Sequence, residues 1–490
     1  MKKPKILTKT KYMAGLQCPR LLWTIFNAPE KIPEKDASSQ YRMNQGIIIG
    51  ELAKKYFPSG IDLSSDDFKK NIEDTKKALK ERKGNLFEAG VITGNIYSRA
   101  DVLLPVGKDK WDIVEVKSST EVKKEYIEDV AFQKFVYEQF GLKIRRCFLM
   151  HINNQYVKDG EIEPKELFVL SEITEEVSDI KDIKKRVSDM FKIIQAKKKP
   201  ETCIGTYCEN PYTCSMMQDC WSNLPDENVF DLYFGGKKSF ELYDRGILEI
   251  KDIPKDFKLS AKQKIQFECA ECGKPKVIKE KIKDFLDGLK YPLYCLDFET
   301  INPALPKYDG MRPYQKIPFQ FSLHIQEKKG AKTKHISYLA DGIDDPRPKL
   351  MQELKNSLGN KGSIIVYNQP FEMGVIKECM EAFPEFKKWG EKILGRIIDL
   401  LHPFRQFHFY HPSQKGSASI KAVLPAITDL NYKGLDIAEG GTASMEYERI
   451  TYEEVDKKEK ERVRKQLEKY CGLDTLAEVR IIDKLWEIIK

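Results

Sequence analysis

Tyr291-Pro-Leu-Tyr-Cys-Leu-Asp-Phe-Glu-Thr300 is the stretch that decides the fold of the C-terminal part of the chain. The segment is short, aromatic and rich in β-forming residues, which predicts a strand. Because alternate residues of a strand share a face, Asp297 and Glu299 point the same way. This part of the chain therefore begins with a strand that presents two carboxylates side by side.

Two further acidic motifs follow. An apolar strand at 363–367 leads into Asn368-Gln-Pro-Phe-Glu372, where the proline favours the opening turn of a helix. A long amphipathic helix near the C-terminus contains Tyr470-Cys-Gly-Leu-Asp474, and residues four apart share a helix face. Four carboxylates gathered from these motifs would repel one another strongly without cations. Two divalent ions about 3.5–4 Å apart cancel that charge and clamp the attacking and leaving oxygens of a phosphoryl transfer. The motifs therefore predict a phosphodiesterase site that binds Mg²⁺ or Mn²⁺.

The order of the three motifs resembles the DEDD superfamily of 3′→5′ exonucleases, in the subgroup whose third motif reads Tyr-x-x-x-Asp. This resemblance covers residues 291–490 and implies an RNase H-like mixed-sheet domain. The metal ligands that it implies are Asp297, Glu299, Glu372 and Asp474. A phenol with a pKa near 10 is a poor base at neutral pH, so Tyr470 would orient the attacking water. The family usually has Asp where this chain has Glu372, which makes Asp399 an alternative ligand.

A second group of acidic residues lies in the N-terminal half. Residues 91–119 alternate as two strands around the polar turn Gly107-Lys-Asp-Lys110. Such a hairpin sets Asp101 nearly opposite Glu115, and Lys117 shares the face of Glu115 because it is two residues away. Asp, Glu and Lys converging in this way bind a divalent metal, lower the pKa of its water and stabilise charge that grows on a phosphate.

These residues resemble the PD-(D/E)xK nucleases, specifically the RecB family, whose fold is similar to that of restriction endonucleases. That family carries Gln-x-x-x-Tyr on the next helix, and Gln133 and Tyr137 supply it here. The resemblance assigns catalysis to these two residues together with the hairpin residues. Many relatives place a His in a Gly-rich helix start upstream. The comparable stretch Gly46-Ile-Ile-Ile-Gly-Glu51 has no His, so one metal ligand is either missing or replaced, with Glu51 as the candidate replacement.

Four cysteines frame the N-terminal half. One lies near the start, in Leu16-Gln-Cys-Pro-Arg20, and three are spaced C-x5-C-x5-C, unlike the short pairs of most structural zinc sites. This layout is similar to that of iron–sulfur RecB-type nucleases, including CRISPR-associated members, in which four thiolates hold a [4Fe–4S] cluster. The ligands that this resemblance implies are Cys18, Cys208, Cys214 and Cys220. Zinc is the alternative metal, and Cys203 is an alternative ligand.

The C-terminal half also contains a basic aromatic loop with His402, His408 and His411. Such a loop would stack bases and touch phosphate at the exonuclease mouth, or it would simply pack between core elements. Next to it, the stretch 416–421 resembles the segment of DEDD proteins that lies on the substrate side.

Composition bounds the class of protein. A chain of 490 residues predicts two to four domains, and 41% hydrophobic with 32% charged residues is ordinary for a globular protein. No apolar run approaches the roughly 18 residues of a membrane span, and no apolar segment follows the basic N-terminus, so we expect a cytoplasmic protein. Eleven cysteines, an odd number, argue against a disulfide framework. A net charge of +8 suits a polyanionic partner.

The sequence therefore predicts an α/β protein in three parts. Residues 1–222 form a RecB-like nuclease with the four-cysteine cluster, residues 223–290 form a mostly helical connector, and residues 291–490 form the exonuclease. The combination resembles a bacterial fusion family. It implies nucleic acid as the partner, DNA more than RNA, and a role in repair or defence. Two alternatives stay open: a nucleic-acid-binding scaffold with degenerate sites, or an exoribonuclease that trims RNA 3′ ends.

Overall fold

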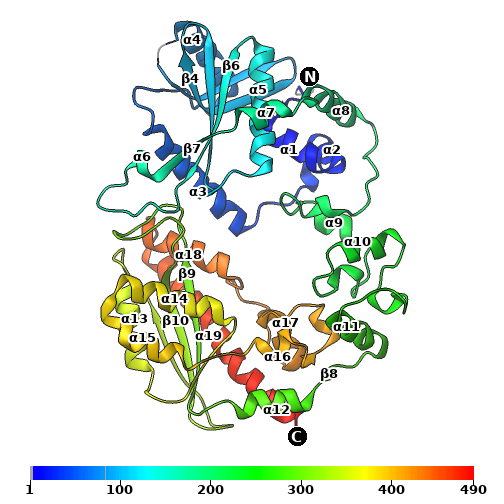
Figure 1. Ribbon diagram of the computed structural model, residues 1–490, viewed down its shortest axis with the longest axis vertical. Helices are drawn as coiled ribbons and strands as arrows, with labels where there is room; N and C mark the ends of the chain where they lie inside the picture. Colours follow the sequence, from blue (N-terminus) through cyan, green and yellow to red (C-terminus); the bar gives the residue numbers. More distant parts are fainter. Residues whose placement is uncertain (1–3, 83) are drawn as a thin grey trace. The chain divides into compact units, whose positions relative to one another are not determined.

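The computed structural model describes residues 4–82 and 84–490, so the first three residues of the basic N-terminus lie outside it. The chain divides into two compact units, described here separately (Figure 1). Unit 1 comprises the chain up to Asn223 together with Pro303–Gln315, and unit 2 comprises Leu224–Asn302 and Lys316–Lys490. The predicted α/β class is confirmed, because both units combine helices with a mixed sheet.

Unit 1 is built on one mixed sheet. Its strands are β1 (Leu7–Thr8), β2 (Ile61–Asp62), β3 (Leu86–Thr93), β4 (Ile96–Val106), β5 (Lys110–Lys117), β6 (Lys143–Ile152) and β7 (Phe168–Glu172). They lie in the order β2-β3-β4-β5-β6-β7, and β1 pairs with β4. The β5–β6 and β1–β4 pairs are parallel, whereas β3, β4 and β5 form an antiparallel meander. The hairpin expected around Gly107 is present as β4 and β5, and its turn uses the positive φ of 57° at Gly107.

Helices pack on both faces of this sheet. They are α1 (Lys9–Gln17), α2 (Pro19–Asn27), α3 (Ala37–Lys54), α4 (Phe68–Glu81), α5 (Lys124–Phe140), α6 (Pro164–Leu167), α7 (Thr174–Asp179) and α8 (Ile183–Gln195). A further helix, α9 (Met217–Trp221), packs apart from the sheet in a small cluster with Leu21 of α2. The period-two alternation of β5 sends Ile113 into the core shared with α1, α5 and α8, and Val114 into the core shared with α3. Burial on both faces fixes the register of the strand that carries Glu115.

Unit 2 has a five-stranded mixed sheet. Its strands are β9 (Leu293–Ile301), β10 (Ile317–Gln326), β11 (Lys334–Leu339), β12 (Ser363–Val366) and β13 (Ile397–Asp399). The order is β11-β10-β9-β12-β13, with β9, β10 and β11 antiparallel and β12 and β13 parallel to β9. The strand predicted from Tyr291 onward is therefore the central one. A small second sheet pairs β8 (Lys276–Val277) with β14 (Phe409–Tyr410).

Helices of unit 2 form a layer on each face of the five-stranded sheet. They are α12 (Lys279–Asp287), α13 (Arg347–Ser357), α14 (Gln369–Ala382), α15 (Lys387–Leu394), α16 (His402–Arg405), α17 (Ile420–Ile427), α18 (Gly440–Tyr452) and α19 (Lys457–Ile488). Two further helices, α10 (Lys237–Asp244) and α11 (Ala261–Cys272), pack in smaller cores apart from this sheet. Leu296 and Phe298 of β9 pack with α13, α14 and α15, whereas Cys295 packs with α12, α17 and α19. Within the described residues, no helix has both the length and the apolar character that crossing a membrane requires.

Candidate metal centres

The N-terminal site brings together four predicted side chains in unit 1. Asp101 Oδ2 accepts a hydrogen bond of 2.7 Å from the backbone N–H of Val116, which aims its carboxyl across the β4–β5 hairpin. Glu115 Oε1 lies 2.6 Å from Lys117 Nζ, and its Oε2 lies 2.6 Å from Gln133 Nε2. The carboxylate of Glu115 is buried and is held on both oxygens. We call Asp101, Glu115, Lys117 and Gln133 the N-terminal site.

Tyr137 takes a supporting position one helical turn after Gln133. Its hydroxyl donates to the carbonyl of Ala89 and accepts from the N–H of Ala100 at 2.9 Å. These bonds tie α5 to β3 and β4 directly beside Asp101. The described contacts of Tyr137 therefore hold α5 against the two strands beside Asp101.

Two charged residues, Lys9 and Asp129, contact the N-terminal site but do not belong to the predicted motifs. Lys9 Nζ lies 2.7 Å from Glu115 Oε1 and 3.8 Å from Asp129 Oδ2, and Lys117 Nζ lies 2.8 Å from the same Asp129 oxygen. Asp129 is four residues before Gln133, and its Oδ1 accepts a hydrogen bond of 3.2 Å from the Gln133 side-chain amide. The i, i+4 spacing on α5 would have indicated Asp129, whereas nothing local to Lys9 indicates a partner so far along the chain.

The charges of the N-terminal site shift its titration. Burial, together with the charge of Glu115, raises the pKa of Asp101 to about 7. Burial would also raise the pKa of Glu115, but Lys117 and Lys9 outweigh it and hold that pKa below its usual range. The site therefore holds one carboxylate that stays ionised and one that gains a proton easily, as long as ammonium groups are its only cations.

Glu51 does not join this cluster in the structure. Its carboxylate pairs with Lys54 at 2.6 Å, its side chain is 64% exposed, and Lys54 also pairs with Asp62. Glu88 of β3 is better placed, because it lines the same cavity as Lys9 and Asp101. Burial raises the pKa of Glu88 against the opposing charge of Arg99, which lies 2.7 Å away. The structure therefore does not place Glu51 beside Asp101 and Glu115, since α3 turns that side chain to solvent.

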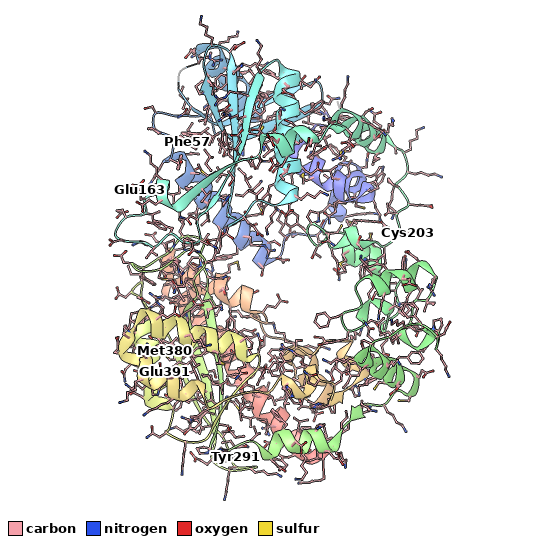
Figure 2. The ribbon with its side chains drawn as sticks, in the orientation of Figure 1. Phe57, Glu163, Cys203, Tyr291, Met380 and Glu391 are labelled. Carbon is pink, nitrogen blue, oxygen red and sulfur yellow. The ribbon has the colours of Figure 1, made fainter. Side chains whose placement is uncertain are left out.

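The framing cysteines converge on one cavity of unit 1. All four predicted ligands line one cavity, together with Cys203, and all are free thiols. Cys18 lies between α1 and α2, and the N–H of Cys214 donates to the carbonyl of Cys208 at 2.8 Å. Cys203 lies on the segment between α8 and α9, where its side chain is exposed (Figure 2). A segment near the N-terminus thus meets one that lies almost two hundred residues later.

The C-terminal site gathers the four predicted carboxylates in unit 2. Glu299, Glu372 and Asp474 are 7%, 2% and 8% exposed. Ligand oxygens of Asp297 and Glu299 lie within 4.8 Å of each other and of the Cys471 sulfur. Three elements supply these groups: β9 brings the first two, the first turn of α14 brings Glu372, and α19 brings Asp474. We call Asp297, Glu299, Glu372 and Asp474 the C-terminal site.

Mutual repulsion in a buried setting dominates the C-terminal site. Burial, followed by the charge of Asp474, raises the pKa of Asp297 well above its usual range. Burial and Asp297 raise the pKa of Glu372 to about 9, and burial raises that of Asp474 to about 6. Glu372 Oε2 has no hydrogen-bond partner among the described residues. Such a group of hard oxygen ligands suits Mg²⁺ or Mn²⁺, which would supply the missing partner and the missing positive charge.

Glu478 is a fifth buried carboxyl that the motifs missed. It is 1% exposed, lies one helical turn after Asp474, and its Oε2 has no hydrogen-bond partner among the described residues. Burial raises its pKa well above the usual range, and Asp297 and Glu372 add to that effect. The i, i+4 spacing from Asp474 on the buried face of α19 would have indicated it.

Aromatic and basic side chains surround Asp474. The hydroxyl of Tyr432 donates to Asp474 Oδ1, and its ring lies 6.4 Å from that of Tyr470 in an edge-on arrangement. Lys421 Nζ lies 5.8 Å and 5.5 Å from the centres of the Tyr432 and Tyr470 rings. The predicted substrate-side segment therefore contributes one cation, Lys421, near Asp474.

Two other predicted features take structural positions. Asp399 Oδ1 accepts from the N–H groups of Asn368 at 3.1 Å and Leu401 at 3.0 Å, so it holds the start of α14. The rings of His402 and His408 lie 5.7 Å apart in a cavity lined by α12, and His411 caps the turn at Ser413. The aromatic residues of this loop are buried, which favours the packed alternative: Phe404, Phe407, Phe409 and Tyr410 are each 3% exposed or less.

Comparisons with known proteins add a family match and two relatives. The family model described as "Domain of unknown function (DUF2779)" matches residues 294–419, which include Asp297, Glu299 and Glu372. The uncharacterized protein MG366 of Mycoplasma genitalium is 25% identical over 232 residues, which cover 44% of this chain and 35% of that protein. The uncharacterized protein UU173 of Ureaplasma parvum is 29% identical over 181 residues, which cover 32% of this chain and 26% of that protein. The chain thus spans about a third or less of the length of these curated relatives.

Proposed function

We propose that this chain is a metal-dependent nuclease with two sites, acting on nucleic acid and preferentially on DNA. In this proposal unit 1 is a PD-(D/E)xK domain and unit 2 is an RNase H-like 3′→5′ exonuclease. The observation that carries it is the convergence of four carboxylates from three elements into the buried C-terminal site. Keeping each carboxylate ionised in a protein interior costs several kcal/mol unless a cation compensates its charge. A purely structural role would not require four such groups in one place.

In the C-terminal site Asp297, Glu299, Glu372 and Asp474 would hold the metal ions. Bound divalent cations would supply a nucleophilic water and neutralise the charge that develops on the phosphate. The phenol of Tyr470 stays protonated at neutral pH, since burial raises its pKa above the usual range, and it therefore orients water as a hydrogen-bonding group. Lys421 lies beside both tyrosine rings, where its charge would attract the phosphate backbone.

In the N-terminal site Asp101 and Glu115 would hold the cation. Lys117 Nζ, 2.6 Å from Glu115, would stabilise negative charge on the phosphate, and Gln133 fixes the second oxygen of Glu115. The net charge of +8 favours association with a polyanion.

Nuclease activity is tested with the full-length chain and Mn²⁺ on oligonucleotides of the same sequence made as DNA or RNA, labelled at the 3′ or the 5′ end. The proposal expects stepwise loss from the 3′ end and faster turnover of DNA. Binding without cleavage of any strand would favour the scaffold alternative, and selective shortening of RNA would favour the trimming alternative.

We further propose that the converging cysteines hold a [4Fe–4S] cluster. The four predicted ligands and Cys203 line one cavity as free thiols, which supports a metal group shared between them. By closing a loop of almost two hundred residues, it would stabilise unit 1 by roughly 4–5 kcal/mol if it acts as a cross-link does.

Replacing Cys214 by serine should remove this cluster. The wild type, purified without oxygen, is expected to be brown with about four irons per chain, whereas Cys214→Ser should lose most of the iron and melt at a lower temperature. Cys272→Ser, at an exposed cysteine outside the cavity, is the matched control and should keep its iron. A colourless wild type that contains one zinc would contradict the iron–sulfur assignment.

Metal binding should stabilise the chain more at higher pH. The carboxyls of Glu372 and Asp474 have folded pKa values of about 9 and about 6, above the values of about 4.5 and 3.8 in the unfolded chain. Without metal, each group therefore contributes its full stability below its unfolded pKa and loses about 1.4 kcal/mol per pH unit until its folded pKa is reached. Mn²⁺ replaces the protons, so the rise in melting temperature that it causes should be larger near pH 8 than near pH 6. A rise of equal size at both pH values would count against metal binding by these carboxyls.

A further inference from the structure

The N-terminal site contains one more ammonium group than its motif requires. Lys9 Nζ and Lys117 Nζ both contact Glu115 Oε1, at 2.7 Å and 2.6 Å. Both also approach Asp129 Oδ2, but Lys117 does so at 2.8 Å and Lys9 only at 3.8 Å. Lys117 therefore has two close carboxylate partners, whereas Lys9 has one.

The backbone around Lys9 is held firmly in place. Leu7 and Thr8 form β1, which pairs with Ile96 and Tyr97 of β4. The Thr8 side chain caps α1, of which Lys9 is the first residue. At the next turn, the ring of Tyr12 stacks on Phe132 of α5 with centroids 4.4 Å apart. At the far end of α1, Cys18 joins the cysteine cavity. Lys9 is thus delivered to Glu115 by a helix that is anchored at both ends.

Lys9 also faces the open side of the site. An open cavity is lined by Thr8, Lys9, Thr10, Glu88, Arg99 and Asp101. The side chain of Lys9 keeps 25% of its surface exposed there, while that of Glu115 is 1% exposed. Two cations, Lys9 and Arg99, line this cavity together with the carboxylate of Asp101, and such cations suit a phosphodiester backbone.

We infer that Lys9 is a catalytic residue of the N-terminal site that contacts a non-bridging oxygen of the phosphate being cleaved. This inference rests on the proposed nuclease function. When Glu115 and Asp101 engage a divalent cation, the ammonium groups on Glu115 are repelled. Lys117 keeps Asp129 at 2.8 Å, so Lys9 is the group released towards the cavity.

Lys9 supplies charge and takes no part in bond exchange. A water oxygen bonds to phosphorus, the bond from phosphorus to the leaving sugar oxygen breaks, and a proton passes from the water to that oxygen. The ammonium stabilises the extra negative charge on the phosphate oxygens while these bonds change, as a preorganised donor does.

The test uses the full-length chain with the C-terminal site inactivated by Asp297→Asn. Lys9→Gln is expected to lower kcat for cleavage by the N-terminal site by about 10²–10³-fold, and Lys9→Arg by much less. Lys11→Gln makes the same charge change two residues along α1, where the lysine lies over the Phe26 ring instead, and should leave kcat unchanged.

Two readouts without turnover separate this role from a structural one. Mn²⁺ should bind Lys9→Gln more tightly than the parent chain, because one ammonium that competes for Glu115 is gone. With Ca²⁺ in place of Mn²⁺, the dependence of duplex binding on the logarithm of salt concentration should lose about 0.9 in slope, the value for one phosphate contact.

The possible failures are distinct. If Lys9→Gln cleaves at the full rate and binds Mn²⁺ more tightly, Lys9 is only an ion-pair partner of Glu115. If Lys9→Gln and Lys11→Gln lose equal activity, the loss comes from a shift of α1. Either result overturns the inference. If Lys9→Gln does not fold, Lys9→Arg is the deciding variant. A loss of kcat in Lys9→Arg as large as that in Asp101→Asn would also overturn the inference. Absence of any cleavage that depends on Asp101 in the parent chain would overturn the proposed function itself.

Discussion

Asp297→Asn is expected to lower 3′→5′ exonuclease turnover by roughly 10³-fold while the chain stays folded. Asp297 is one of the four carboxylates that would hold the ions, and losing metal-based stabilisation worth about 4 kcal/mol corresponds to that factor. Asparagine has the same shape and no charge. Since burial and Asp474 raise the pKa of Asp297, the variant avoids the cost of this carboxyl and should be at least as stable as the wild type without metal at neutral pH.

A matched control is Asp287→Asn on α12, in the same unit. Asp287 is half exposed and pairs with Lys283 one turn earlier on the surface, so its loss should change turnover and stability little. Equal exonuclease rates for Asp297→Asn and the wild type would exclude the C-terminal site as the source of that activity.

Asp101→Asn is expected to lower a second, separate cleavage activity by a similar factor of roughly 10³. The hydrogen bond from the Val116 N–H is kept, because the amide oxygen of asparagine also accepts, so the hairpin should keep its geometry. The activity that depends on Asp297 should be unaffected, since the two side chains belong to different compact units.

Asp109→Asn, in the turn of the same hairpin, controls for general damage. Its carboxylate is 55% exposed and pairs with Lys143, so cleavage should be unchanged. If Asp101→Asn and Asp297→Asn each removed the same activity, the chain would have one nuclease site and not two.

Local sequence patterns predicted those parts of the fold whose signal is local. The strand that carries Asp297 and Glu299 was recognisable from its β-forming composition, and the hairpin that carries Asp101 from its polar turn at Gly107. The helix that carries Asp474 followed from its periodicity. Each depends on residues within one element, which sequence spacing reports directly.

Residues 303–315 belong to unit 1 although the residues on either side of them belong to unit 2, and sequence patterns could not predict this. The segment leaves unit 2 after β9 and groups with unit 1, where the hydroxyl of Tyr314 donates to the carbonyl of Ser118. Ala304 joins the core around α3. A tertiary contact of this kind has no periodic signature, so the sequence assigned the segment to the C-terminal domain.

The site residues, like the elements of the fold, divide into those with a local sequence signal and those without one. Asp129 and Glu478 lie four residues from predicted site residues on the same helices, so a systematic search of helix faces would have found them. Lys9 and Tyr432 reach Glu115 and Asp474 from distant elements, and only the folded chain brings them there. The expectation for Glu51 came from its place in a motif, whereas the orientation of α3 exposes its side chain beside Lys54.

The central claim is that carboxylates from β9, α14 and α19 meet around divalent ions. A crystal structure of the Mn²⁺-soaked protein with anomalous data collected at the manganese edge tests it most directly. We predict two anomalous peaks roughly 3.5–4 Å apart, from manganese ions that are ligated by Asp297, Glu299, Glu372 and Asp474. An electron density map in which these four side chains are well ordered and no anomalous peak lies between them would contradict the account.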